Sequence, residues 1–359
     1  MSEVILLTGA TGFVGQALLS KWLRDSDARL ALLVRGRRDA TPEQRVEGAL
    51  RDFTRADPAP WMERIETFNA DVSVPGFGLS SRDTEGLTRR VTHVVHCAAA
   101  ARFDLDLDEA RRTNVGGPRN ILEFAAGCPR LRRIDYIGTA YVAGRRAGLV
   151  LEDELDAGQE HRNTYERSKF EAETMVREWT ARLPISILRP SIVVCDSRTG
   201  YASNHNGFYR ALRMYLKGGL TALPGFPTSQ LDLVPVDYVA DAAFALAQTP
   251  RSIGACYHLA AGPARSTTLG EVRELAARHS GLRPFDLIPP ERFSALAAQM
   301  AKGLPPEGLK ALNEMQLYMP YLLCEHQFDS SRTVRDTGMQ APEVGDYFAK
   351  FVEFILHAT

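Results

Sequence analysis

The stretch TGATGFVG, at residues 8–15, decides the fold of this chain. It follows an apolar run at residues 4–7, which predicts a strand, and it precedes residues 16–23, whose apolar spacing predicts a helix. The N-terminus of such a helix offers free N–H groups and a partial positive charge to phosphates. Three spaced glycines can also form an ordinary turn, but the flanking strand and helix favour a dinucleotide-binding turn.

Each glycine of this turn has a distinct role. Gly9 makes the tight exit from the strand, and Gly12 lets the backbone approach a pyrophosphate with no Cβ in the way. Gly15 lets the helix pack closely on the sheet. We therefore expect all three glycines at the cofactor site.

Composition limits the remaining possibilities. The chain has 359 residues, 45% of them hydrophobic, which supports a large core with a second, smaller lobe. A formal net charge of −1 gives no sign of a nucleic-acid groove or a polybasic membrane patch. The N-terminus has no signal-peptide pattern, and no apolar run approaches about 18 residues. We expect a cytoplasmic protein with no membrane span.

The cysteines and histidines do not suggest a metal site. Five cysteines lie far apart without a CxxC pair, which is typical of reduced thiols. His93 and His96 lie in a strand pattern, where residues three apart point to opposite faces. No metal is predicted.

Strand and helix patterns alternate along the first half of the chain. They predict the α/β class, with a Rossmann-type doubly wound parallel sheet and a smaller C-terminal substrate-binding lobe. We expect residues 1–198 to form the Rossmann domain, with residues 229–262 returning to it. Residues 199–228 and 263–359 would form the lobe. The predicted sheet strands are residues 4–7, 29–34, 65–70, 92–97, 131–137 and 184–188.

The residue after the second strand indicates the coenzyme. NAD-selective Rossmann units carry an acidic residue about 20 positions beyond the glycines, where it binds the ribose hydroxyls. Here that position is Arg35, followed by Arg37 and Arg38. A guanidinium suits a 2′-phosphate, so we predict NADPH; the alternative is a solvated basic turn.

Two further positions complete the predicted cofactor site. Asp71, after the third strand, can accept a hydrogen bond from the adenine amino group, although a turn aspartate is nearly as plausible. Ala98 begins a run of small side chains after the fourth strand that leaves space for the ribose and pyrophosphate. The alternative for this run is simple tight packing.

A helix through Asn114 is interrupted by Gly116, Gly117 and Pro118. A proline inside a helix removes an amide donor and bends the helix. We therefore expect the freed backbone of Asn114 to hold a water in the active site.

The chemistry centres on Tyr165 and Lys169, in the sequence YERSK. Positions i and i+4 share a helix face, so the ammonium should lie beside the phenol. Together with the positive nicotinamide of the oxidised cofactor, it should lower the pKa of the phenol from about 10. Lys169 can also bind the nicotinamide ribose. Thr139 follows the fifth strand, where ligands bind in open α/β sheets, and supplies a second hydroxyl to the substrate. The motif YxxxK alone is common by chance as a surface pair.

The sequence resembles the extended short-chain dehydrogenase/reductases over roughly its first 250 residues. The matching motifs are TGATGFVG at Thr8, HCAA at His96, TNVGGPRN around Asn114, IGTAYVAG around Thr139, YERSK at Tyr165 and LRPS at Leu188.

Within that superfamily the chain is more similar to fatty acyl-CoA reductases and to the terminal thioester-reductase domains of carboxylic acid reductases and peptide synthetases. The segments IGTAYVAG, AAARFDLDLDEARRTNV and LDLVPVDYVADA carry this likeness. The resemblance implies a catalytic set of Thr139, Tyr165 and Lys169. It implies NADPH binding by Gly9, Thr11, Gly12, Phe13, Gly15, Arg35, Asp71 and the loop after Pro190, which begins at Ser191.

The leading hypothesis is NADPH-dependent reduction of an acyl thioester, on coenzyme A or an acyl carrier protein, to an aldehyde; a second hydride transfer would give the alcohol, and the sequence leaves open whether it occurs. The sequence holds no adenylation or carrier segment and lacks the extra C-terminal region of many fatty acyl-CoA reductases, so the substrate is less certain than the fold. The sequence is also compatible with a homodimer. Candidate acyl-channel residues, which are more often core, are Phe208, Tyr209, Met214, Tyr215 and Leu223.

Two alternatives remain. The same catalytic residues would serve a reductase or dehydrogenase of a small ketone, a sterol or a nucleotide sugar. A non-catalytic NADP-binding scaffold is the third hypothesis, and the presence of both Tyr165 and Lys169 argues against it.

Overall fold

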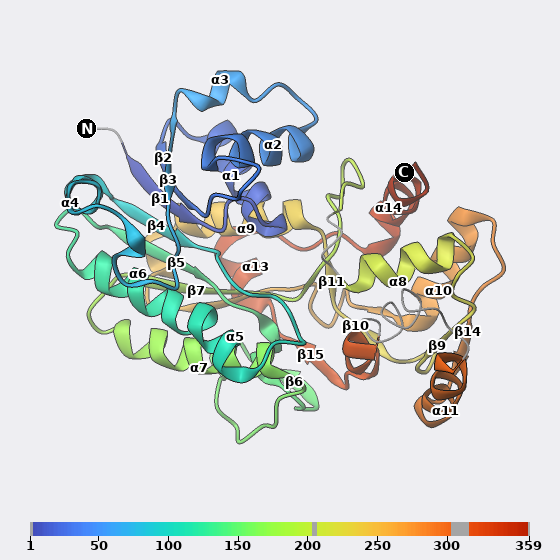
Figure 1. Ribbon diagram of the computed structural model, residues 1–359. Helices are drawn as coiled ribbons and strands as arrows, with labels where there is room; N and C mark the ends of the chain where they lie inside the picture. The colour runs from blue at the N-terminus through green and yellow to red at the C-terminus, as the bar shows by residue number, and fades with distance from the viewer. Residues whose placement is uncertain (1–2, 203–206, 303–315, 358–359) are drawn as a thin grey trace.

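The computed structural model describes residues 3–202, 207–302 and 316–357. Figure 1 shows two parts side by side, a larger one around a central sheet and a smaller one built mainly of helices. Within the described residues, no helix combines the length and the apolar character that crossing a membrane requires.

The larger part is organised by a 7-stranded sheet in which every strand pairing is parallel. The strand order reverses between β1 and β4, which is the switch point where ligands bind in doubly wound sheets. The predicted Rossmann sheet is therefore confirmed. In spatial order the strands are β3 (Ile65–Asn69), β2 (Arg29–Val34), β1 (Val4–Thr8), β4 (His93–His96), β5 (Arg133–Ile137), β7 (Ile185–Pro190) and β12 (Cys256–Leu259).

Helices cover both faces of this sheet. Successive side chains of a strand point to opposite faces, and the side chains on both faces are mainly apolar. In β1, Ile5 and Leu7 join one core cluster, whereas Leu6 joins the other. The first face carries α1 (Phe13–Asp25), α2 (Pro42–Thr54) and α9 (Val236–Ala247). The second face carries α4 (Ser81–Arg90), α5 (Leu107–Asn114), α6 (Gly116–Ala126) and α7 (Thr164–Trp179).

The smaller lobe has its own core, formed where helices α8, α10 and α14 pack together around Phe351. Its helices are α8 (Gly207–Leu216), α10 (Leu269–Ser280), α11 (Pro290–Ala301) and α14 (Val344–His357). Short two-stranded sheets join segments far apart in sequence. They pair β8 (Ile192–Val193) with β11 (Leu233–Val234), β9 (Ala222–Pro224) with β14 (Asp286–Ile288), β10 (Gln230–Leu231) with β13 (Thr267–Thr268), and β6 (Gly148–Val150) with β15 (His326–Phe328).

Part of the C-terminal region returns to the larger part. Strand β15 pairs with β6, and helix α13 (Ser331–Thr337) packs against α9 and β12. Residues 326–337 therefore lie on the Rossmann side, although they fall within the segment 263–359 that we assigned to the lobe. The remaining short elements are α3 (Ala59–Met62) and the 3₁₀ turns η1 (Pro75–Gly78), η2 (Ala140–Ala143), η3 (Pro250–Ser252) and η4 (Met319–Leu323).

Local signals placed several helix ends. Thr41 and Gln44 form a reciprocal capping box at the start of α2. The predicted break near Pro118 is present, since α5 ends at Asn114 and α6 begins at Gly116. Helix α1, however, begins at Phe13 rather than at residue 16, because its first turn is part of the glycine turn.

Candidate active site

The glycine turn requires its glycines for steric reasons. Gly9 has a φ of +74°, and a Cβ on it would lie 2.7 Å from the amide nitrogen of Ala98. A Cβ on Gly15 would lie 1.9 Å from the carbonyl oxygen of Gly9. Gly15 therefore lets α1 close onto the turn itself, rather than onto the sheet as we expected.

The first turn of α1 is available to an anion. Gly12 occupies its N-cap, and no side-chain hydrogen bond caps the helix. The amide groups that a capping side chain would satisfy are thus left for a ligand, and the helix dipole favours negative charge there. This geometry fits the pyrophosphate of a dinucleotide.

The end of β4 is tied closely to the end of β1. The hydroxyl of Thr8 accepts hydrogen bonds from the amides of Cys97 and Ala98, each at 3.2 Å. Ala98 therefore lies against Gly9, beside the turn, where we predicted space for the cofactor.

Basic side chains gather beside the glycine turn. Arg45 of α2 donates to the carbonyl oxygen of Arg35 and, over 3.1 Å, to the hydroxyl of Thr11. Burial, together with the nearby charges of Arg37 and Arg35, lowers the pKa of Arg45. Mutually repelling guanidinium groups at this position would be stabilised by a phosphate. We did not predict Arg45, although its place in the first turns of a capped helix after β2 is a usable signal.

Asp71 lies across from this cluster. Its carboxylate lies 3.6 Å from Nη1 of Arg35 and accepts two hydrogen bonds from Ser73. Burial alone would raise the pKa of Asp71, but the hydrogen bonds from Ser73 and the charge of Arg35 bring it below its usual value. The predicted contact of Asp71 with adenine remains a prediction.

Thr139 and Tyr165 meet at the carboxyl ends of the strands. Thr139 follows β5 and is buried. Its hydroxyl accepts a hydrogen bond from the amide of Tyr141 over 3.3 Å and lies close enough to the phenol of Tyr165 to affect its pKa. Tyr165 lies in the first turn of α7, which is capped by the side chain of Asn163 through the amide of Glu166. Two hydroxyl groups can therefore converge on one substrate oxygen.

The structure corrects the expected pKa of Tyr165. Burial raises this pKa to about 12, and the hydrogen bond from Thr139 offsets only part of the rise. Lys169 does not donate to the phenol. Its Nζ donates to the carbonyl oxygen of Ile137 over 3.1 Å and lies 4.7 Å from the ring centroid of Tyr136.

The side chain of Asn114 forms hydrogen bonds to two separate segments of the chain. Its amide group bonds both the N–H and the carbonyl of Ala100, and its Nδ2 donates to the hydroxyl of Ser168 over 2.9 Å. It thus fastens the loop after β4 to the catalytic helix. Pro118 has no N–H to donate to the Asn114 carbonyl, so the predicted water there remains a prediction.

The remaining predicted cofactor residues lie in two places. Pro190 ends β7, and Ser191 donates its hydroxyl to Asp232 over 2.5 Å and its amide to the carbonyl of Leu259 over 3.3 Å. Phe13 is partly buried, with its ring 6.1 Å from that of Tyr201.

An aromatic wall adjoins Tyr165. The ring of Phe103 lies 5.4 Å from Tyr165, 4.9 Å from Tyr318 and 5.2 Å from Tyr321. Phe103 comes from the loop after β4, and both tyrosines come from the C-terminal region. No local sequence pattern marks these contacts, because they join distant segments.

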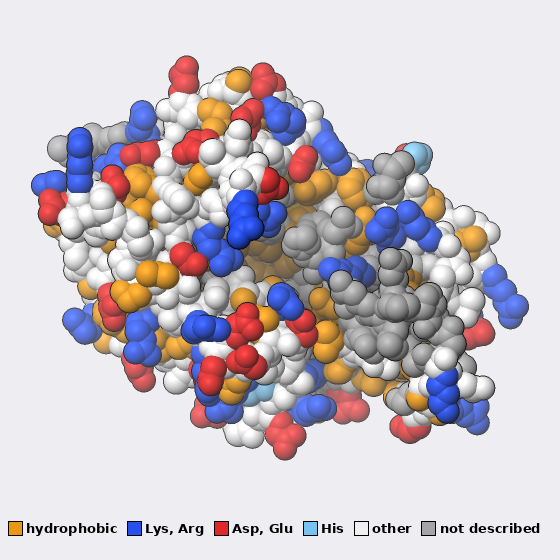
Figure 2. Space-filling model, viewed as in Figure 1, with side chains coloured by type: hydrophobic (Ala, Val, Ile, Leu, Met, Phe, Trp, Pro, Cys, Tyr) orange, Lys and Arg blue, Asp and Glu red, His pale blue; other side chains and the backbone are white. Residues whose placement is uncertain are grey.

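Three of the five acyl-channel candidates are core residues of the lobe, whereas Phe208 and Met214 are partly buried against that core. Tyr209, Tyr215 and Leu223 are each at most 5% exposed and pack in the cluster around Phe351. Figure 2 shows a hollow between the two parts, with hydrophobic side chains at its floor and Lys or Arg side chains on its rim.

Known proteins are similar to this chain in sequence and in architecture. A sequence profile of the NAD-binding family described as "Male sterility protein" matches residues 7–243. Fatty acyl-CoA reductase 1 of Homo sapiens is 30% identical over 307 residues, which cover 75% of this chain and 59% of that protein. Fatty acyl-CoA reductase 1 of Arabidopsis thaliana is 25% identical, over 79% of this chain and 72% of that protein. This chain thus spans about three fifths of the length of its human relative.

A solved structure extends the likeness over nearly the whole chain. The terminal R domain from the myxalamid PKS-NRPS biosynthetic pathway superposes with a TM-score of 0.87 and 28% sequence identity. The match covers 99% of this chain and 91% of that domain. The lobe as well as the sheet therefore has a counterpart in that domain.

Proposed function

Because the chain belongs to the male sterility protein family of NAD-binding proteins, we propose that it is an NADPH-dependent reductase of acyl thioesters. The thioester would be carried by coenzyme A or by an acyl carrier protein. The observation that carries this proposal is the closeness of the Thr139 hydroxyl to the Tyr165 phenol, which places two hydroxyl groups together at the carboxyl edge of the sheet. The similarity to fatty acyl-CoA reductases and to a terminal R domain supports the thioester as substrate.

The arginine cluster supports NADPH as the coenzyme. The uncapped start of α1 would hold the pyrophosphate, and Arg35, Arg37 and Arg45 would surround the 2′-phosphate. Asp71 pairs with Arg35, so its negative charge is partly offset and its carboxylate would orient that guanidinium toward the phosphate.

The residues would act on the thioester carbonyl as follows. Bound NADPH would supply the hydride to the carbonyl carbon. Thr139 and Tyr165 donate hydrogen bonds to the carbonyl oxygen, so the charge that develops there is stabilised most in the transition state. The protonated Lys169 adds positive charge close to this oxygen. The resulting hemithioacetal collapses to an aldehyde and a free thiol, and a second reduction gives an alcohol.

The wall beside Tyr165 favours an acyl substrate over a nucleotide sugar. A diphosphate requires free cations, whereas Phe103 and Tyr318 present apolar rings there. The nearby guanidinium of Arg162 is engaged by the Gly144 carbonyl and by the carboxylate of Glu166. A small ketone or a sterol remains the second candidate substrate.

The test is a substrate panel. Purified protein is incubated with NADPH or NADH and with acyl-coenzyme A esters of graded length, the same acyl groups on a carrier protein, and free ketones and aldehydes. We expect NADPH consumption with thioesters and an aldehyde or alcohol in the mass spectrum. Turnover of free ketones with none of any thioester would contradict the proposal.

A homodimer through α5 and α7 is not favoured by their exposed face. There Arg111 and Arg167 both pair with Glu171, so an interface would bury charges that are already paired within the chain. We therefore propose that any dimer uses another surface. Light scattering of the wild type and of Glu171→Ala should then give the same mass.

A further inference from the structure

The catalytic helix carries a third functional position in line with Tyr165 and Lys169. Glu173 follows Lys169 by four residues, so the three side chains lie along one face of α7. Glu173 and Lys169 are both buried, Glu173 completely and Lys169 at 3% exposure. A fully buried carboxylate is costly unless it serves as a partner to other charges.

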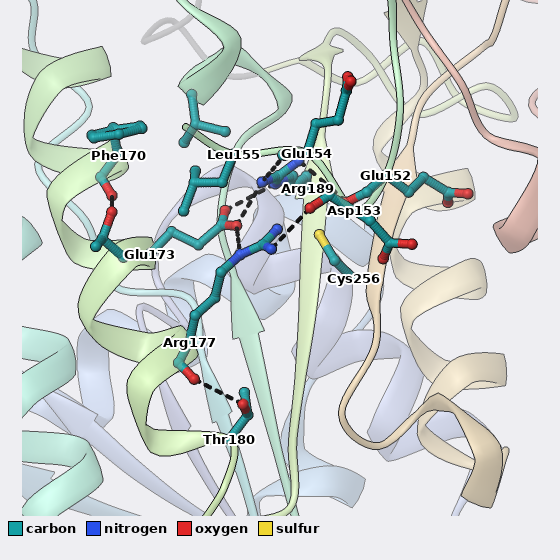
Figure 3. Close-up of polar contacts among 12 residues, drawn as sticks. Glu152, Asp153, Glu154, Leu155, Phe170, Glu173, Arg177, Thr180, Arg189 and Cys256 are labelled. Atoms are coloured by element: carbon teal, nitrogen blue, oxygen red, sulfur yellow. Dashed lines mark hydrogen bonds and ion pairs between the residues drawn. The ribbon is translucent and has the colours of Figure 1, made fainter. Parts of the chain in front are cut away.

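Glu173 is held by two arginines (Figure 3). Arg189 of β7 binds both carboxylate oxygens, at 2.6 and 2.9 Å, and its side chain is also fully buried. Arg177, one turn along α7, donates to the same carboxylate over 3.0 Å. The bidentate pair between Glu173 and Arg189 fixes the position of α7 against the sheet.

Arg189 in turn is held in place by neutral acceptors. It donates to the backbone carbonyls of Glu152 and Glu154 and lies 3.1 Å from Nε2 of His258. These contacts orient the guanidinium but do not neutralise it. Glu173 is therefore the counter-charge within this network, against Arg189, Arg177 and the neighbouring Lys169.

We infer that Glu173 is a positioning residue that keeps Lys169 protonated in the buried site and holds it in register with Tyr165. This inference rests on the proposed function, since it assigns Lys169 a catalytic charge. Without Glu173, Arg189 and the partly exposed Arg177 would lose the carboxylate that they share, and Lys169 would lose the carboxylate one turn along its helix. Asp153 and Glu154, which also interact with Arg189, are already paired with Arg332 and Arg146. Of the three cations around Glu173, the ammonium is the one that can release its proton.

The other groups around Lys169 cannot replace this carboxylate. The ammonium contacts the face of the Tyr136 ring, and the nearby titratable groups are Tyr165, Cys97 and His96. Burial raises the pKa of Tyr136, Tyr165 and Cys97, and it lowers the pKa of His96 to about 3. All four are therefore neutral near pH 7. Burial lowers the pKa of Lys169 to about 8, and interactions with Cys97 and Glu173 oppose this fall; of these two, Glu173 is the group that carries a charge near pH 7.

The test measures the proton on Lys169 directly. The chain has six lysines, so protein labelled with [ε-¹³C]lysine gives few signals, and Lys169→Arg identifies the one that matters. We expect Glu173→Gln to lower the midpoint of this titration by about one pH unit, as loss of a close opposite charge does. Glu173→Asp, which keeps the charge, should restore most of the shift.

Two matched variants separate charge from structure. Glu171→Gln makes the same chemical change on α7, but at a carboxylate that pairs with Arg111 and Arg167 on the surface, so the Lys169 midpoint should stay in place. Arg177→Gln removes a cation from the Glu173 network, so the midpoint should stay or rise. An unchanged midpoint in Glu173→Gln would overturn the inference, and so would equal shifts in Glu173→Gln and Glu171→Gln.

The pH dependence of kcat is a second measurement of the same coupling. The alkaline limb of kcat should move to lower pH in Glu173→Gln, by the same amount as the titration midpoint. If Glu173→Gln does not fold, the double variant Glu173→Gln/Arg177→Gln, which removes one charge of each sign, should have a lower midpoint than Arg177→Gln alone. Full turnover by Lys169→Ala would instead remove the catalytic role proposed for Lys169, while the titration would still report the coupling.

Discussion

Nη2 of Arg45 donates a hydrogen bond to Oγ1 of Thr11 over 3.1 Å, which joins helix α2 to the glycine turn. The same guanidinium also binds the carbonyl of Arg35. One side chain thereby connects the turn that would hold the pyrophosphate with the strand end that would select the coenzyme.

Replacing Arg45 should therefore weaken NADPH more than NADH. We expect Arg45→Ala to raise the KM for NADPH about tenfold, as loss of a charge-assisted hydrogen bond does, with little change for NADH. Steady-state kinetics with both coenzymes measure this. Arg51→Ala is the matched control, because Arg51 lies on the same helix and pairs with Glu47 at the surface. Equal losses for both coenzymes in Arg45→Ala would contradict the 2′-phosphate role.

The hydroxyl pair at the site predicts a large loss of turnover. Tyr165→Phe should reduce kcat by about 10² to 10⁴, because the phenol gives a hydrogen bond or a proton only in the transition state. NADPH binding, followed by fluorescence, should be retained. Thr139→Ala should reduce kcat by about 10², whereas Thr139→Ser keeps the donor and most of the activity. A scaffold protein would show normal function in every one of these variants.

Replacing glycine by alanine should have opposite effects on the protein at two positions. The Cβ in Gly15→Ala would lie 1.9 Å from the Gly9 carbonyl, so the turn must shift and NADPH should no longer raise the melting temperature. In α2, Gly48 has no atom within 4 Å of such a Cβ. Gly48→Ala should therefore stabilise the protein by about 1 kcal/mol. If NADPH protects both variants equally, the close contact at Gly15 has no bearing on binding.

Stability should fall as the pH drops from 7 to 5. Burial lowers the pKa of His96 from 6.5 to about 3, so the unfolded chain binds this proton more readily than the folded protein. The contribution is complete above the unfolded pKa and is lost as pH falls toward the folded one. His96 alone should cost about 2 kcal/mol between pH 7 and 5. Urea unfolding at both pH values measures the difference.

The control for this pH dependence is another histidine. His96→Gln should reduce the loss between pH 7 and 5 by about 2 kcal/mol. His279→Gln, at an exposed position of α10, should leave the loss as it is in the wild type. A loss that is identical in both variants would show that His96 is not the group responsible.

Much of the fold could be predicted because it depends on local patterns. Apolar runs located the six predicted sheet strands to within a few residues. The seventh strand, β12 (Cys256–Leu259), lies in the segment 229–262 that we expected to return to the Rossmann domain. The start of α1 was placed three residues late, because glycines carry no apolar periodicity from which a helix could be read.

The candidate site was less predictable, since its contacts join segments far apart in the chain. Phe103 reaches Tyr165 and Tyr321 from a loop without a pattern, and the apolar residues around Tyr209 fill the core of the lobe instead of a channel. Motif spacing identified which groups carry the chemistry but not which atoms they bind.

By itself, the amino-acid order determined the parallel doubly wound sheet and the chemical groups along its carboxyl edge, because periodicity and glycine conformation act over a few residues. Only the tertiary structure decided the electrostatics of those groups. The pKa of Tyr165 is raised rather than lowered, and burial lowers the pKa of Lys169, because desolvation is set by side chains that folding brings in from distant strands and loops.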